Sequence, residues 1–151
     1  MAHNFKDFPE LTNPQMNLYY FQSPHKQITE DFRAKVTKVT DGDTIRVKTD
    51  FRDFDFPIRF KGIDTPELNE AGGKEAKEFL KEKIEGAEVE ILIDRSNRVD
   101  KWGRLVGDVM IGGEKMQDTE LRLGLATTFE RRNEGEIPPL SKELNIKNWI
   151  K

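Results

Sequence analysis

The sequence predicts a single α+β domain, mainly β, in which five short strands and two helices follow one another. Apolar residues alternate with polar residues over five short stretches. One stretch with helical spacing separates the third strand from the fourth, and another follows the fifth. A chain of 151 residues suits one domain and can bury a core without disulfides or metals to hold it.

The five strands are expected within residues 33–39, 45–47, 56–60, 89–93 and 105–111. In the first, Ala34 and Val36 alternate with polar residues and then Val39 breaks the phase, which predicts a β-bulge. The stretch 50–55 reads as the hairpin connection between the second and third strands, and Gly112-Gly113 ends the fifth.

Two helices are expected beside these strands. The first covers residues 76–84, where Ala76, Phe79, Leu80 and Ile84 lie at helical spacing before Gly86. The second covers residues 116–123, ending at Gly124. Three strands, a helix, two strands and a further helix fit a five-stranded, partly open Greek-key barrel of the OB type.

The two ends of the chain show a weaker pattern. Residues 1–32 contain three prolines and the aromatic run Tyr19-Tyr20-Phe21. We interpret them as an extended arm whose aromatic residues pack on the domain; the alternative is a docking segment for a protein partner. The domain then spans 33–151. Pro138-Pro139 bars a continuous helix, and 141–151 are expected to form a short helix anchored by Leu144 and Trp149.

Composition excludes several functional classes. The chain has no cysteine, so disulfides, thiolate nucleophiles and cysteine-ligated zinc are excluded. Its two histidines, His3 and His25, both lie near the N-terminus, which argues against a histidine-rich metal site. The net charge of −3 is unlike that of a basic module that coats nucleic acid.

The sequence contains no run apolar enough to cross a membrane and no secretory signal, so no membrane partner is expected. These absences predict a cytoplasmic protein, or a secreted one if the chain is a processed form. The oligomeric state is not indicated.

Carboxylates and threonines gather where the predicted strands begin and end. Asp41-Gly42 by itself is typical of a hairpin turn. Asp43, however, opens a strand, where aspartate is disfavoured, and it needs a partner. Asp64, Thr65 and Glu67 crowd oxygen ligands and a candidate base into four residues. Such oxygen-rich sites without sulfur or imidazole suit Ca²⁺ or Mg²⁺.

Arg59 and Arg104 are candidates to bind one phosphate. Arg59 interrupts the apolar alternation of its strand, and Arg104 begins the fifth strand after a glycine. Each alone is more typical of a surface position, but together they can make bidentate contacts to a phosphate. A metal and two arginines would neutralise the transition state of phosphodiester hydrolysis, and Glu67 would orient the attacking water.

Three segments together resemble the signature segments of the staphylococcal nuclease (thermonuclease-like) family. They are Val39–Thr44, Ile58–Glu67 and Asp100–Arg104, in the order of the family and at similar spacings. The resemblance runs from about Ala34 to Phe129, nearly two-thirds of the chain. It implies the same five-stranded barrel.

The resemblance also implies roles for particular residues. Asp43 and Asp64 correspond to carboxylate ligands of Ca²⁺, which is expected in preference to Mg²⁺, and Thr65 to the residue that lends its backbone carbonyl. The remaining correspondences are Arg59 and Arg104 as the phosphate-binding arginines, Glu67 as the general base, and Lys101 as a lysine beside the substrate phosphate.

The resemblance further implies an endonuclease that hydrolyses DNA, preferably single-stranded, and RNA, with little sequence preference and with 3′-phosphate products. Trp102 stands where the family has a tyrosine, so it is expected to stack on a base without offering a phenolic hydroxyl. The segment 133–151 diverges from the long C-terminal helix of the type member. The alternative function is a non-catalytic OB-fold module that binds nucleic acid or protein within a larger assembly.

Overall fold

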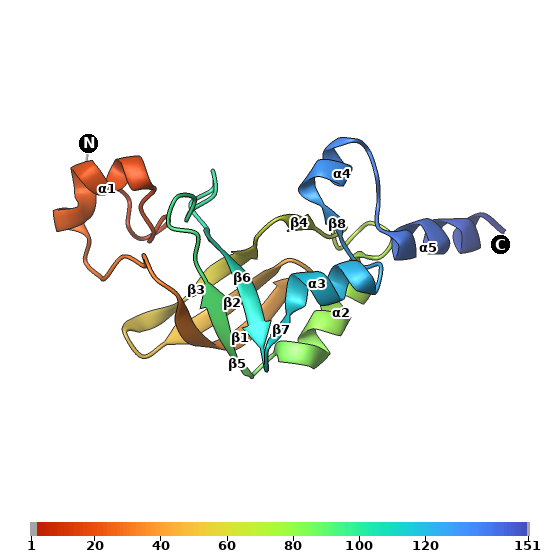
Figure 1. The fold of residues 1–151 in the computed structure, drawn as a ribbon, viewed down its shortest axis with the longest axis horizontal. Helices are drawn as coiled ribbons and strands as arrows, with labels where there is room; N and C mark the ends of the chain where they lie inside the picture. The colour runs from red at the N-terminus through yellow and green to blue at the C-terminus, as the bar shows by residue number, and fades with distance from the viewer. Residues whose placement is uncertain (1–2, 151) are drawn as a thin grey trace.

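Five strands form a closed barrel at the centre of the molecule (Figure 1). The computed structural model describes residues 3–150, with side chains described as far as residue 145. The barrel strands are β1 (Phe32–Asp41), β2 (Thr44–Thr49), β3 (Arg52–Phe60), β5 (Glu88–Leu92) and β6 (Leu105–Ile111). Their order is β3-β2-β1-β5-β6, and a parallel pairing of β3 with β6 closes the barrel. The predicted five-stranded, OB-like Greek-key barrel is confirmed.

The parallel seam between β3 and β6 brings distant parts of the chain together. Ile58, Arg59 and Phe60 of β3 pair with residues 105–107 of β6, whereas the other barrel pairings are antiparallel. Short strands complete the sheets: β4 (Ile63–Asp64) pairs with β8 (Thr127–Thr128), and β7 (Glu114–Lys115) pairs with the end of β6. The seam therefore fixes the position of β3 relative to the chain that leads into β6.

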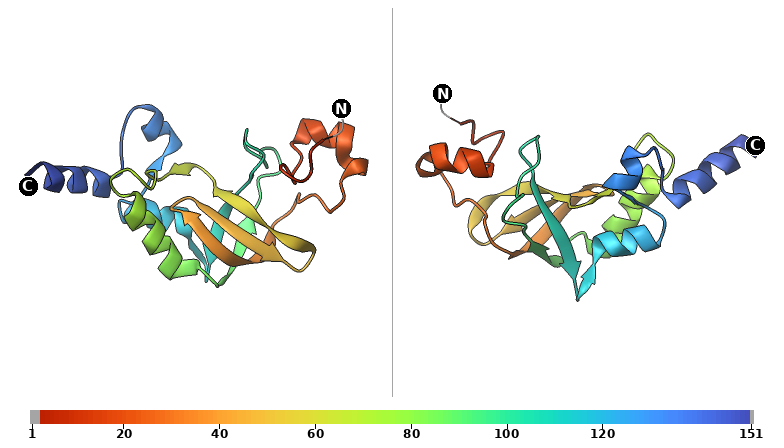
Figure 2. Two further views of the ribbon diagram at one scale, coloured as in Figure 1. Left: turned by 180° about the vertical axis from the view of Figure 1, so that it is seen from behind. Right: turned by 45° about the horizontal axis from the view of Figure 1, so that its top comes forward.

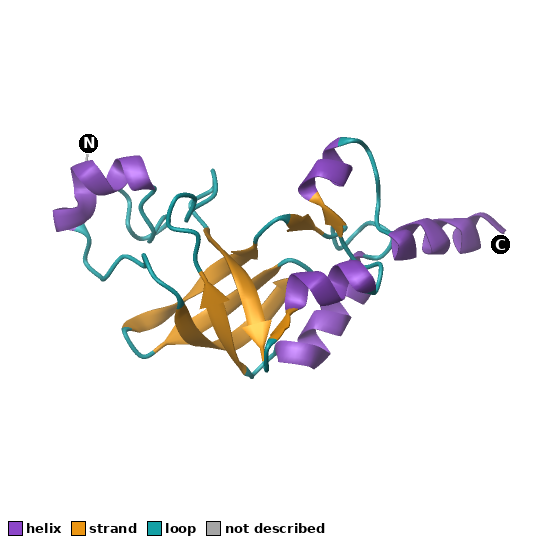
Figure 3. Cartoon of the chain, viewed as in Figure 1, coloured by secondary structure: helices purple, strands orange, loops and turns teal. Residues whose placement is uncertain are grey.

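Two helices cover one end of the barrel, as the secondary-structure colouring makes plain (Figure 3). The helix α2 (Gly73–Ile84) buries Ala76, Leu80 and Ile84, which lie at the predicted spacing. The helix α3 (Met116–Arg122) is followed by Gly124, whose φ of 76° suits a residue without a side chain. Both predicted helices are confirmed, although α2 begins three residues before the expected start.

The predicted bulge in β1 is confirmed, because the β1–β2 register shifts between Val36 and Lys38 and again between Val39 and Asp41. The predicted hairpin connection at 50–55 is wrong in length. The strand β3 begins at Arg52, with Thr49 paired to Arg52. Alternation continues back from Phe56 through Phe54 to Arg52, and Arg52 is the inward-facing residue at 4% exposure. A buried arginine conceals the alternation in the sequence.

Residues 3–31 form an arm that is folded rather than extended. It contains α1 (Asn13–Tyr19) and the 3₁₀ turn η1 (Tyr20–Gln22). Thr12 and Gln15 cap α1 reciprocally, since each side chain accepts a hydrogen bond from the other's backbone N–H. The expected packing of the aromatic run on the domain is wrong for Phe21, which is fully exposed, and Tyr20 is half exposed.

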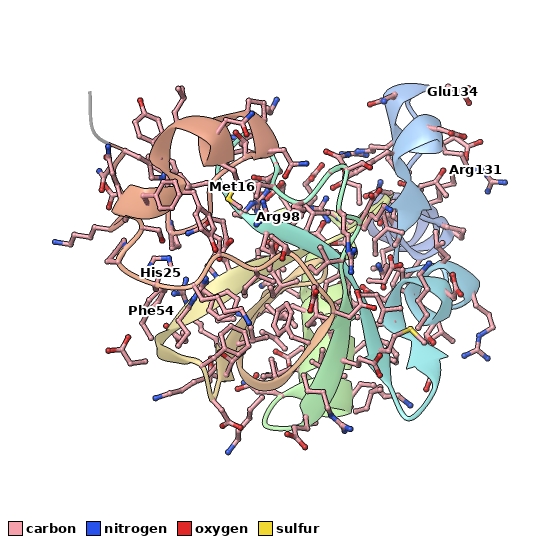
Figure 4. The ribbon with its side chains drawn as sticks, turned by 60° about the vertical axis from the view of Figure 1, so that its left-hand side comes forward. Met16, His25, Phe54, Arg98, Arg131 and Glu134 are labelled. Atoms are coloured by element: carbon pink, nitrogen blue, oxygen red, sulfur yellow. The ribbon has the colours of Figure 1, made fainter. Side chains whose placement is uncertain are left out.

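The arm is attached to the barrel by buried polar contacts. Glu10 is 2% exposed and accepts hydrogen bonds from Arg52 of β3 and from Arg98, which precedes β6. Arg98 also donates to the backbone carbonyls of Leu11 and Ile28 at 3.0 and 2.6 Å. Figure 4 shows Arg98 at this junction and His25 of the arm beside Phe54 of β3, with ring centroids 5.1 Å apart.

The C-terminal segment forms two helices, α4 (Phe129–Asn133) and α5 (Pro139–Ile150). The sequence did not indicate α4, and α5 begins two residues before the predicted start, with Pro139 in its first turn. The predicted anchor Leu144 is part-buried, and Trp149 lies outside the side chains that the structure describes. The arm and α5 lie at opposite ends of the barrel in each view (Figures 1 and 2).

No helix within the described part of the chain has the length and apolar character needed to cross a lipid bilayer.

Candidate active site

One cavity of about 780 Å³ at the rim of the barrel collects nearly all of the predicted site residues. Its wall also contains equal numbers of acidic and basic side chains, five of each. The predicted site residues in this wall are Asp43, Arg59, Asp64, Glu67, Lys101, Trp102 and Arg104. Thr65 is not part of the wall, because it is buried behind Asp43.

The turn between β1 and β2 holds Asp43 in place. The Asp43 N–H donates to Asp41 Oδ1 at 3.0 Å, which forms an Asx turn. Asp43 Oδ2 accepts hydrogen bonds from the backbone N–H and the hydroxyl of Thr65, both at 3.0 Å. Thr44 donates its hydroxyl to Asp43 Oδ1 at 3.1 Å. Three hydrogen-bond donors thus fix the orientation of this carboxylate, and the Asx turn fixes its backbone.

Gly42 allows α2 to approach this turn closely. A Cβ placed on Gly42 would lie 2.6 Å from the Cβ of Ala76 in α2 and 2.8 Å from the hydroxyl oxygen of Thr65. Contacts this short force neighbouring atoms apart. The helix is therefore packed directly against the turn that presents Asp43.

Arg59 lies between the two predicted carboxylate ligands. Its Nη2 is 3.4 Å from Asp43 Oδ2 and 3.4 Å from Asp64 Oδ1. The guanidinium also donates to the backbone carbonyls of Phe60 and Ile63, both at 2.9 Å, and its Cζ lies 5.3 Å from the centroid of the Phe129 ring. Arg59 lines the cavity rather than the barrel interior, but at 8% exposure it is buried, unlike the surface arginine that its position in the strand would suggest.

A second guanidinium group contacts Asp64 from the opposite side. Arg132 of α4 places Nε 3.2 Å from Asp64 Oδ2 and Nη2 3.9 Å from Glu70 Oε2. Its neighbour Arg131 is exposed, and Figure 4 shows it with Glu134 on the outer side of α4. Asp64 therefore lies between Arg59 and Arg132.

The turn at 100–104 forms a further part of the cavity wall. Asp100 Oδ1 accepts the backbone N–H groups of Trp102 and Arg104, both at 2.9 Å, and Asp100 Oδ2 lies 2.8 Å from Arg104 Nε. Trp102 is 61% exposed, with Lys101 Nζ 4.4 Å from its ring centroid. An exposed indole, an ammonium group and a guanidinium are thus presented together on one rigid turn.

The carboxyl groups of the cavity perturb one another. Burial, hydrogen bonding with Asp43 and the charge of Asp43 raise the pKa of Asp41 to about 7. Burial acts to raise the pKa of Asp43 too, but hydrogen bonding with Asp41, the charge of Arg59 and the bonds from Thr65 together lower it. Burial and the charge of Asp43 raise the pKa of Asp64. A cation beside these groups would relieve their repulsion.

The residues of the cavity could bind a hard cation only if water or substrate oxygens supplied the remaining ligands. Among the described residues, no group of three or more histidine, cysteine, aspartate or glutamate side chains is arranged to hold a metal ion. One Oδ atom of Asp43 and one of Asp64 both lie 3.4 Å from Nη2 of Arg59. A cation could therefore contact both carboxylates once the Arg59 guanidinium moves aside. Water and a phosphate oxygen would complete the oxygen shell that Ca²⁺ or Mg²⁺ requires.

Glu67 lies at the edge of the cavity, in the segment between β4 and α2. Its side chain is exposed, and its backbone N–H donates to Glu70 Oε1 at 2.9 Å. An exposed carboxylate beside the metal-ligand candidates can reach a water molecule in the cavity.

Among the residues of this region that were not predicted from the sequence are Asp41, Glu120 and Arg132. Asp41 was interpreted as a turn residue only. Glu120 of α3 is fully buried, and neither carboxylate oxygen has a hydrogen-bond partner among the described residues. Its position four residues after Met116, on the buried face of the helix, was a usable signal. Burial, and the charges of Asp43 and Asp41, raise the pKa of Glu120 well above 4.5.

Replacing Glu120 with leucine is expected to stabilise the protein. A buried polar group without a partner costs about 1–3 kcal/mol, so Glu120→Leu should raise the free energy of unfolding near neutral pH by this amount. Because the folded pKa of Glu120 lies above its ordinary value of 4.5, the folded state retains a proton that the unfolded state loses. Stability therefore decreases as the pH rises from 4.5 towards the folded pKa.

Urea unfolding between about pH 5 and pH 8 measures this effect. The decrease should be smaller in Glu120→Leu and in Glu120→Gln, while the raised pKa of Asp41 leaves a remainder. The matched control is Glu82→Leu on the exposed face of α2, which should change stability by no more than about 0.5 kcal/mol. Unchanged stability and an unchanged pH profile in Glu120→Leu would contradict the prediction.

The fold and the cavity together define an OB-like barrel protein with an acidic and arginine-rich site at its rim. Residues 57–145 match the family described as "Staphylococcal nuclease homologue", and the chain belongs to that family.

Named relatives agree with this membership. The chain is similar to the staphylococcal-like nuclease CAN1 of Arabidopsis thaliana, at 37% identity over 82 residues that cover 52% of this chain and 24% of the relative. The SPbeta prophage-derived endonuclease YokF of Bacillus subtilis is 33% identical over 95 residues, covering 59% and 31%. Endonuclease YncB of the same species is 32% identical over 115 residues, covering 69% and 52%. The matches thus span between about a quarter and a half of each relative's length.

Proposed function

We propose that this protein is a Ca²⁺-dependent nuclease that hydrolyses phosphodiester bonds of single-stranded DNA, and of RNA, with little sequence preference. The observation that supports this most directly is the meeting of Asp43, Asp64 and Arg59 at one point of the cavity. Two ligand candidates for a hard cation lie beside a guanidinium that can bind phosphate. The relatives named as nucleases and endonucleases add weight to the same activity.

Each residue of the cavity has a separate role in the proposed mechanism. Asp43, Asp64 and the backbone carbonyl of Thr65 would hold Ca²⁺, which supplies positive charge to a phosphate oxygen when bound. Arg59 and Arg104 bind the phosphate from two walls of the cavity and stabilise the charge that develops in the transition state. Glu67 accepts a proton from the attacking water, and its exposure gives it access to that water.

Substrate binding involves the turn at 100–104. Lys101 attracts the phosphate backbone, and the exposed ring of Trp102 offers a face on which a base can stack. Neither group reads the edge of a base, which is consistent with low sequence preference. The wall of the cavity has equal numbers of acidic and basic side chains, so a bound cation favours entry of an anionic strand.

The proposal predicts that cleavage depends strictly on a divalent cation. Purified protein should degrade a labelled single-stranded oligonucleotide in Ca²⁺. Cleavage should stop in EDTA and resume when Ca²⁺ is added back. Mg²⁺ should support less activity. The matched control is Asp43→Asn, which replaces a charged ligand candidate by a neutral one and should remain inactive at every Ca²⁺ concentration.

Two outcomes would count against this assignment. Cleavage that continues in EDTA and survives in Asp43→Asn would remove the metal from the proposed mechanism. Binding of the oligonucleotide without cleavage in any metal would favour the alternative function, a non-catalytic OB-fold binding module.

A further inference from the structure

A second groove lies on the other side of the 100–104 turn. It has a volume of about 420 Å³ and runs between this turn and the N-terminal arm. Asp100 and Lys101 line both this groove and the candidate active-site cavity. The groove and the cavity therefore adjoin at these two residues.

The arm contributes aromatic side chains to the groove. His3, Phe8 and Tyr19 all line it, and the ring of His3 lies 6.4 Å from that of Phe8 and 5.9 Å from that of Tyr19. Phe8 is 43% exposed, and Tyr19 is partly exposed. Clustered aromatic rings with accessible faces are what proteins use to stack successive bases of a single strand.

The charges around the groove favour an anionic chain. Glu10 is the carboxylate that the arm contributes to the lining, and it is neutralised by contacts with both Arg52 and Arg98. The other lining carboxylate, Asp100, is paired with Arg104. Lys101 is left as the exposed charge of the groove, which suits a phosphate between two bases.

Direct contacts join the two walls of the groove. Arg98, two residues before Asp100, hydrogen-bonds the backbone of the arm at Leu11 and Ile28. Phe8 packs on Gly103, where an added Cβ would lie 2.6 Å from Phe8 Cδ1. A preformed site loses less conformational entropy on binding than a flexible one.

We propose that the arm and the 100–104 turn form an additional nucleotide subsite, in which the single strand leaving the active site stacks a base against Tyr19 and Phe8. This proposal rests on the proposed function for the identity of its ligand, single-stranded nucleic acid. It gives residues 3–31 a role in substrate binding, and it predicts that the protein prefers strands long enough to reach from the cavity into the groove.

Binding without cleavage provides the test. Fluorescence anisotropy in EDTA would compare a labelled thymidine trinucleotide with a labelled thymidine decamer on the full chain. The wild-type protein should bind the decamer more tightly than the trinucleotide. Since stacking contributes a factor of about 5 to 160 in affinity per base, Tyr19→Ala should weaken decamer binding by this factor and leave trinucleotide binding unchanged. Tyr19→Phe, which retains the ring, should bind like the wild type.

The matched control is Tyr20→Ala, which removes a half-exposed aromatic side chain one residue away that does not line the groove. Equal effects of Tyr19→Ala and Tyr20→Ala on decamer binding, or equal wild-type affinity for the two lengths, would overturn the subsite. Cleavage of the trinucleotide in Ca²⁺, measured separately, reports on the proposed function alone. Normal cleavage without a length preference in binding would contradict the proposed subsite and leave the proposed function supported.

Discussion

Replacing Arg104 with alanine is expected to lower kcat for single-stranded DNA by about 10²–10³-fold, the usual cost of removing one preorganised donor to a transition-state oxyanion. The guanidinium is held over the cavity by Asp100, with Arg104 Nε 2.8 Å from Asp100 Oδ2. Its side chain is 29% exposed, so the substitution creates no buried cavity. Single-turnover cleavage at saturating Ca²⁺ measures the effect on the chemical step.

The turn that holds Arg104 should survive this substitution. Asp100 would keep the hydrogen bonds from the backbone N–H groups of Trp102 and residue 104. A suitable control is Arg95→Ala, which removes an arginine that is 75% exposed and lies outside the cavity lining. Arg104→Lys, which restores charge without the bidentate fork, should recover only part of the rate. Near-normal kcat in Arg104→Ala would refute the proposed role.

Arg59 offers a less direct test of the chemistry. Its guanidinium donates to two backbone carbonyls and lies within salt-bridge distance of two carboxylates. Removing the Arg59 guanidinium would leave Asp43 and Asp64 without the positive group that both contact, and it would also alter the local fold. A loss of activity in an Arg59 variant would therefore combine stability with catalysis.

Replacing Glu10 with alanine is expected to destabilise the protein by about 3–5 kcal/mol, because it leaves two buried arginines without their carboxylate. The side chains of Arg52 and Arg98 are 0% and 2% exposed, and both contact Glu10. Equilibrium urea unfolding, followed by circular dichroism, measures the change in the free energy of unfolding.

The control for Glu10→Ala is a substitution in a salt bridge at the surface. Arg46 and Asp55 are 38% and 44% exposed and lie 3.1 Å apart, so Asp55→Ala should cost less than about 1 kcal/mol. Glu10→Gln, which keeps hydrogen-bond acceptors but not the charge, should lie between the wild type and alanine. A cost for Glu10→Ala no greater than that for Asp55→Ala would show that the buried cluster does not stabilise the junction.

The barrel could be predicted from the sequence because its signals are local. Alternation marks the strands, Val39 marks the bulge, and Gly86 and Gly124 mark the helix ends. The start of β3 was missed because Arg52 occupies an inward-facing position that Glu10, 42 residues away, and the Lys26 carbonyl make tolerable. The helix α1 was missed although its capping pair, Thr12 and Gln15, was readable in the sequence.

The candidate site could likewise be predicted only in part. Recurrent residue types at family spacing identified seven of the side chains that line the cavity. The perturbed carboxyls Asp41 and Glu120 could not be predicted in the same way, because burial and charges brought close by folding determine their pKa values. Arg132 contacts Asp64 through α4, which left no clear pattern in the sequence.

The parallel seam between β3 and β6 has a consequence for when the protein becomes active. Arg59 pairs with Val106 across this seam, and Arg104 lies just before the paired stretch, so the two arginines face the same cavity only after the seam has formed. Pairing of strands so far apart in the chain is slow compared with helix formation. A chain still emerging from the ribosome, or one released with its barrel open, would therefore lack the paired arginines that the proposed hydrolysis requires.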